Sequence, residues 1–176
     1  MMISTHTYSA RRLAAVAVLA AMTAAGCSTV QRKAEVTPVD QHFMLFAAAT
    51  GTAEVKMGQL AAEKSTDPRV REFGQRMVTD HQRVNAQLMQ IAQAKKVTLP
   101  MAMDPANRTL YEELSALSGP EFDRQYLASQ VNIHAMGNAL YANEAENGLD
   151  PDVTRFARDN TSVGVQHFSI ARSMVR

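Results

Sequence analysis

The stretch DPRVREFGQRMVTDHQRVNAQLMQIAQAK (residues 67–95) decides the fold of this chain. It begins with Asp-Pro, in which aspartate suits the N-cap of an α-helix and proline suits its first turn. Side chains of one face then recur at spacings of three and four, and they are Phe73, Met77, His81, Val84, Leu88 and Ile91. The pattern predicts an amphipathic helix over 68–95 whose buried face is apolar except for one histidine.

Three other segments, 40–64, 120–147 and 151–175, repeat this pattern. Asp150-Pro151 marks the start of the last one, and Gly148 is a natural stop for the one before it. Their predicted buried faces are Phe43, Ala47, Thr50, Glu54, Met57 and Ala61 in the first, Leu127, Val131, His134, Tyr141 and Ala145 in the second, and Phe156, Val163, His167, Ile170 and Met174 in the third. Four helices that each bury one such apolar face, or stripe, predict a four-helix bundle.

The segment 96–119 joins the second and third long helices and is longer than a simple turn. It contains Pro100 and, over 105–117, a short amphipathic pattern that again starts with Asp-Pro. Composition favours an all-α fold, because Ala, Leu, Val and Met supply most apolar positions and tryptophan is absent. We expect a long crossover with one short helix. The sequence leaves open whether this crossover runs the length of the bundle.

Each of the four stripes is interrupted by one ionisable residue: Glu54, His81, His134 and His167. With a rise of about 1.5 Å per residue, all four lie within roughly one helical turn of the same depth, whichever way the crossover runs. Buried ionisable groups cost free energy unless they are paired. Three explanations are open: a site for one transition-metal ion such as iron, zinc or copper, a metal-free hydrogen-bonded network, or histidines that tilt to the bundle surface.

Other residues are weaker candidates for a metal site. Asp80 points about 100° away from His81 around the helix, so it is either a ligand or a group that orients one. Glu144 lies about 15 Å along the helix from His134 and cannot share an ion with it. The pair Met101 and Met103 resembles a soft copper(I) clasp, although methionine more often fills irregular helical cores.

The N-terminal segment 1–26 has the features of a removable signal peptide. It holds no acidic residue, carries two adjacent arginines, and has an apolar run that is too short to span a bilayer. Small residues then precede Cys27, the only cysteine, and this site resembles the lipobox of bacterial lipoproteins. We expect a lipidated Cys27, a polar tether over 27–38, and a folded domain over 39–176 at the periplasmic face of the outer membrane. The alternative is ordinary cleavage that leaves Cys27 as a free thiol.

Charge and motif content limit the classes of partner and function that fit this sequence. The chain has 18 basic and 17 acidic residues, so no field of one sign is available to attract nucleic acid. It contains no phosphate-binding loop or nucleotide fingerprint, and Cys27 is its only thiol, which favours a non-enzymatic role. The expected partner is the membrane, reached through the lipid anchor. Four such stripes are compatible with a monomer or a homodimer.

Several segments together resemble a family of secreted bacterial proteins known as domain of unknown function 4142. The resemblance covers about residues 40–175, and its specificity comes from the combination. The segments are FMLFAAATGTAEVKMGQLAAEK (43–64), RMVTDHQRVN (76–85), VTLP (97–100), LSGPEFDRQYL (117–127) and His167.

This resemblance implies a ferritin-like four-helix fold and an envelope location, but it implies no established activity. Di-iron proteins of ferritin-like fold use Glu-x-x-His pairs, and this sequence has none. Asp80 stands directly before His81, and Ile133 precedes His134 where family members often have aspartate. These departures argue against a ferroxidase. We therefore expect an envelope lipoprotein that binds one transition-metal ion in its core; the alternative is a structural or interaction module with a metal-free polar core.

Overall fold

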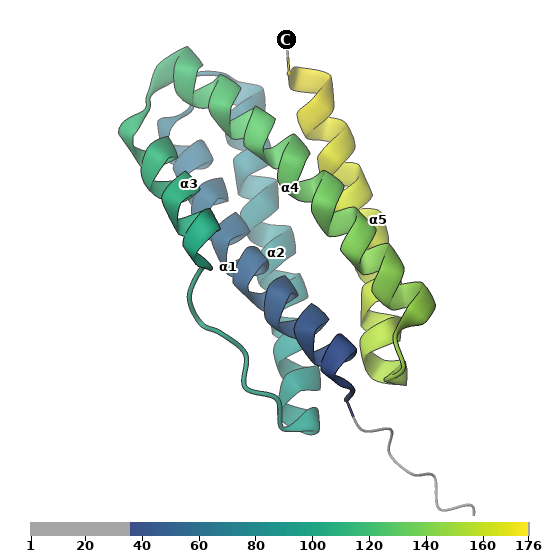
Figure 1. Ribbon diagram of the computed structural model, residues 1–176. Helices are drawn as coiled ribbons and strands as arrows, with labels where there is room; N and C mark the ends of the chain where they lie inside the picture. Colours follow the sequence, from purple (N-terminus) through teal and green to yellow (C-terminus); the bar gives the residue numbers. More distant parts are fainter. Residues whose placement is uncertain (1–35, 176) are drawn as a thin grey trace, which may run out of the picture. The chain divides into compact units, whose positions relative to one another are not determined.

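The computed structural model describes residues 36–175, which form five α-helices and no strand (Figure 1). The helices are α1 (Pro38–Lys64), α2 (Pro68–Lys95), α3 (Pro105–Ala116), α4 (Gly119–Asn147) and α5 (Pro151–Met174). The expected all-α class is confirmed, with four long helices and a short one in the crossover. The expectations for segment 1–26 and for Cys27 fall outside the described residues.

Local capping chemistry sets where the helices begin. α2, α3 and α5 each start with Asp-Pro, and the side chains of Asp67, Asp104 and Asp150 accept hydrogen bonds from amides of the first turn. α1 starts at Pro38 rather than at the expected residue 40, because Thr37 and Asp40 form a capping box. The expected tether over 27–38 is therefore too long at its C-terminal end, since its last residues already belong to this helix start.

The crossover runs the length of the bundle, which the sequence had left open. The Thr66 hydroxyl and the Asp67 amide donate to the Asp123 carboxylate, so the turn between α1 and α2 lies beside the start of α4. At the opposite end, Lys95 of α2 pairs with Asp150 at the start of α5. The chain therefore returns between α2 and α4, and α3 lies along α1 on the way (Figure 1). One such long crossover is typical of ferritin-like bundles.

The core consists of two apolar clusters with a polar level between them. One cluster includes Phe43, Val84, Leu88, Val153 and Phe156, and the other includes Met57, Phe73, Met77, Phe122 and Tyr126. Along α2, α4 and α5 the histidines fall between the segments that supply these two clusters. Among the described residues, no helix is both long and apolar enough to cross a membrane.

Candidate metal centre

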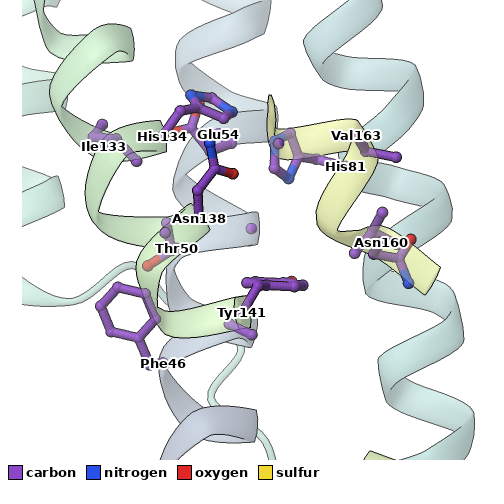
Figure 2. A pocket seen from close by; sticks show the side chains of 15 residues that line it. Phe46, Thr50, Glu54, His81, Ile133, His134, Asn138, Tyr141, Asn160 and Val163 are labelled. Carbon is purple, nitrogen blue, oxygen red and sulfur yellow. The ribbon is translucent and has the colours of Figure 1, made fainter. Parts of the chain in front are cut away.

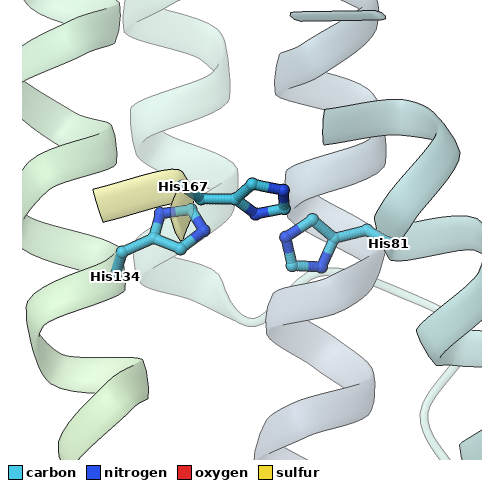
Figure 3. Close-up of side chains that lie close together, drawn as sticks. All are labelled: His81, His134 and His167. Carbon is cyan, nitrogen blue, oxygen red and sulfur yellow. The ribbon is translucent and has the colours of Figure 1, made fainter. Parts of the chain in front are cut away.

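Three histidines from three different helices meet at this polar level. His81 comes from α2, His134 from α4 and His167 from α5, and their imidazole rings face one another (Figure 3). One ligand atom from each lies within 4.8 Å of the others, and the ring centroids are 5.2 to 5.9 Å apart. His134 and His167 are 5% and 0% exposed, so these two do not tilt to the bundle surface. This arrangement can offer three nitrogen ligands to a single ion.

Hydrogen bonds outside the cluster fix two of these rings. The Nδ1 of His134 lies 2.9 Å from the carbonyl oxygen of Gln130, and the Nε2 of His167 lies 2.9 Å from Oδ2 of Asp80. Because a carbonyl and a carboxylate can only accept, each of these nitrogens must carry the proton. The other nitrogen of each ring is then a free electron-pair donor. Histidines that bind metals are commonly held in this way.

Unpartnered nitrogens remain inside the cluster. Nδ1 of His167 and Nε2 of His81 are buried and have no hydrogen-bond partner. Buried polar atoms usually have a partner, because each one left alone costs about 1 to 3 kcal/mol. The cluster therefore contains two buried ring nitrogens that no protein group satisfies.

Burial keeps all three imidazoles neutral at physiological pH. It lowers the pKa of His134 to about 4 and holds the pKa of His81 well below the ordinary value. His167 also has a lowered pKa, because burial outweighs the opposing effect of Asp80. Neutral imidazole is the form that binds a metal ion, so no proton has to leave these rings first.

Asp80 occupies the position of an orienting group. It belongs to α2 beside His81, but its carboxylate reaches across to the ring of His167 on α5. Its two oxygens also lie 3.5 Å from Nε of Arg76 and 4.0 Å from an Nη of Arg83. The sequence left two roles open for Asp80, and the contact to His167 favours the orienting one.

Glu54 lies beside the three histidines but outside their group. It is 1% exposed on α1 and, like His81 and His134, it lines a cavity in the bundle (Figure 2). Burial raises the pKa of its carboxyl group to about 8, although the nearby Gln130 amide opposes that shift. Neither oxygen has a partner in hydrogen-bond geometry. The prediction that four groups would converge is therefore met by three, with Glu54 as a neutral neighbour at pH 7.

Two buried polar side chains on the same face of α4 as His134, those of Tyr126 and Gln130, were absent from the sequence prediction. The Tyr126 hydroxyl and both amide atoms of the Gln130 side chain are buried without a partner. They stand at positions 126 and 130 on α4, and His134 follows at the same spacing of four. Residues four apart share one helix face, so this spacing was the available signal.

Met101 and Met103, whose resemblance to a copper(I) clasp was the weaker interpretation, lie in different surroundings. Met101 is 77% exposed, whereas Met103 packs against the apolar cluster that contains Phe73. Glu144 also lies away from the histidines: it is buried near the start of α5, where burial, Asp40 and Asp150 together raise its pKa to about 7. Neither feature adds a ligand to the three-histidine group.

Fold and site together define an all-α bundle with one long crossover and a buried three-histidine cluster. The chain belongs to the family described as domain of unknown function DUF4142, whose model matches residues 25–174. No curated protein matches the chain in sequence.

Solved structures share the fold at low sequence identity. A DUF305 fragment from Deinococcus radiodurans is similar with a TM-score of 0.71 and 15% identity, covering 81% of this chain and 98% of the other. CopM in its Cu(II)-bound form gives a TM-score of 0.65 and 16% identity, covering 77% and 95%. CopM in its Ag-bound form gives 0.62 and 18%, covering 76% and 93%. At these identities the likeness extends to the fold alone.

Proposed function

We propose that this chain is a lipid-anchored envelope protein that binds one divalent transition-metal ion through His81, His134 and His167. The observation that carries the proposal is the meeting of three neutral imidazoles within 4.8 Å, two of them oriented by outer hydrogen bonds. Such a ligand set suits copper and zinc, and copper(II) binds most tightly in the general order of divalent ions. The role is metal handling in the envelope rather than catalysis.

The unpartnered polar atoms favour an ion over the alternative of a metal-free network. A network stabilises a core only when its members satisfy one another. Here two histidine nitrogens, Nε2 of His81 and Nδ1 of His167, have no partner. A bound cation supplies one for the nitrogens and favours the carboxylate form of Glu54 beside it. The fold that this chain shares with CopM, a structure solved with Cu(II), makes copper the first ion to test.

The mature protein should bind one equivalent of Cu²⁺, and Zn²⁺ more weakly at the same site. Isothermal titration calorimetry of the metal-free protein gives the stoichiometry, and competition between the two ions shows whether they share the site. Electron paramagnetic resonance of the Cu²⁺ form should show nitrogen ligands. A stoichiometry well below one, or a spectrum with oxygen ligands only, would contradict the proposal.

Replacing Cys27 with alanine should release the protein from the membrane. Cys27 is the only thiol and follows the small residues that end the proposed signal segment. Without a thiol no diacylglyceryl group can be attached, so the variant should move from the membrane fraction to the soluble periplasm or fail to mature. Ser28→Ala is the matched control and should keep its lipid. An unmodified N-terminus of the native protein in mass spectrometry would refute the lipid anchor.

A further inference from the structure

A cavity of about 50 Å³ lies directly beside the histidine cluster. His81, His134 and Glu54 line one end of it, and Figure 2 shows Tyr141 and Phe46 at the other end. A single water needs roughly 10 to 15 Å³, so the space is large enough for a group of a few heavy atoms. Because two of the three histidines belong to both the cluster and the cavity wall, an ion that they hold borders this space.

Three protein ligands leave a coordination position open. Sites that are filled by four protein side chains are closed, whereas three histidines leave room for water or another small ligand. Glu54 does not belong to the group whose ligand atoms converge. The coordination position that the three histidines leave open on a bound ion is therefore adjacent to the cavity.

One threonine hydroxyl on the cavity wall lacks the backbone partner that helical threonines usually have. Within the described helices, the side chains of Thr52, Thr79, Thr109 and Thr161 donate to the carbonyl oxygen four residues earlier. The hydroxyl of Thr50 makes no such bond, is buried, and lines the cavity. Both oxygens of the fully buried Glu54 are likewise unpartnered on the same wall. The Thr50 hydroxyl therefore has an unused hydrogen bond to donate into the cavity.

We propose that this cavity is a binding site for a small anionic ligand of up to three heavy atoms, which coordinates the ion held by the three histidines and accepts a hydrogen bond from Thr50. The inference rests on the proposed metal site and adds an exchangeable fourth ligand to it. Hydroxide and azide have the required size and charge. An anion at this position offsets part of the charge of a buried divalent ion.

Azide tests the inference on the mature protein, purified in detergent and loaded with one equivalent of Cu²⁺. Direct coordination should produce an azide-to-copper charge-transfer band that saturates with azide concentration. Thr50→Val keeps the side-chain volume but removes the donor, so it should weaken azide binding about tenfold and leave Cu²⁺ affinity within about threefold. The tenfold figure corresponds to one hydrogen bond of roughly 1.4 kcal/mol.

A variant that fills the cavity provides a second test of the anion site. A Cβ atom added at Gly137 meets no atom within 4 Å, so a larger side chain fits there without a clash, and Gly137 lines the cavity. Gly137→Leu should abolish the azide band while Cu²⁺ still binds. Ala139→Leu places the same leucine side chain at an exposed position of α4 that does not line the cavity, and it should behave like the native protein.

The outcomes separate this inference from the proposed function. Failure of the native protein to bind Cu²⁺ would overturn the proposed function and the anion site with it. Cu²⁺ binding to the histidines without an azide band would overturn the anion site alone. So would an azide affinity that is equal in the native protein, Thr50→Val and Gly137→Leu, because azide would then bind somewhere other than this cavity.

Discussion

Replacing His167 with alanine should weaken Cu²⁺ binding by more than about 100-fold. Removing an outer partner of a ligating histidine typically costs 10 to 100-fold in affinity, and removing the ligand itself exceeds that range. Asp80→Asn should weaken Cu²⁺ binding by about 10 to 100-fold, because it alters only the carboxylate that orients His167. Competition with a chelator of known affinity measures both losses. His42→Ala removes an exposed histidine of α1 and should leave Cu²⁺ affinity unchanged.

Variants of the clustered histidines should behave as one unit in unfolding experiments. A ligand present at about 100 times its Kd stabilises the native state by about 2.7 kcal/mol, so Cu²⁺ should raise the urea midpoint of the native protein. His81→Ala, His167→Ala and the double variant should each lose nearly all of this increment. The second replacement then adds little to the loss that the first has caused.

Two other results would each exclude a metal role. In a metal-free network, removing one histidine leaves another buried group unsatisfied and destabilises the fold by about 1 to 3 kcal/mol, with no effect of Cu²⁺. If the histidines do not interact at all, the losses in the single variants are small and add up in the double variant. Either pattern would leave a helical envelope protein whose core tolerates histidine.

Lys95→Met should destabilise the protein by about 3 to 5 kcal/mol, the usual cost of removing one partner of a buried ion pair. The Lys95 side chain is 4% exposed, and its ammonium lies 2.6 Å from Asp150 and 2.8 Å from Asp152. Burial alone would lower the pKa of Lys95, but the hydrogen bonds to these aspartates outweigh it and raise the pKa. Without the ammonium, the fully buried Asp150 carboxylate loses the charge of Lys95 while it still lies near the buried acids Asp40 and Glu144.

A double variant shows whether the loss comes from the uncompensated charge. Asp150→Asn removes the charge and keeps a good N-cap for α5. Lys95→Met combined with Asp150→Asn should therefore be more stable than Lys95→Met alone. Lys56→Met, at an exposed position of α1, should change the free energy of unfolding by less than about 0.5 kcal/mol. Urea unfolding followed by circular dichroism measures the free energy of unfolding of the native protein and of these three variants. A loss below about 1 kcal/mol for Lys95→Met would contradict a stabilising buried ion pair between Lys95 and Asp150.

Helix positions were predictable from local sequence because capping is local chemistry. Each Asp-Pro pair places an acceptor and a pre-set φ angle within one turn of the helix that it starts. The error at α1 has the same origin, since Thr37 and Asp40 act together and Asp40 alone resembles a cap. The level of the three histidines also followed from the sequence, because the rise per residue is constant along a helix.

Contacts between helices could not be predicted from helix capping and the rise per residue. The sequence determined that four amphipathic helices form, where they begin and end to within about two residues, and that three histidines and Glu54 share one depth. Only the tertiary structure decided the direction of the crossover, the reach of Asp80 to His167, and the place of Glu54 beside the cavity rather than among the histidines. The reason is that capping and periodicity depend on neighbours along the chain, whereas these contacts depend on how helices far apart in sequence are rotated and packed against one another.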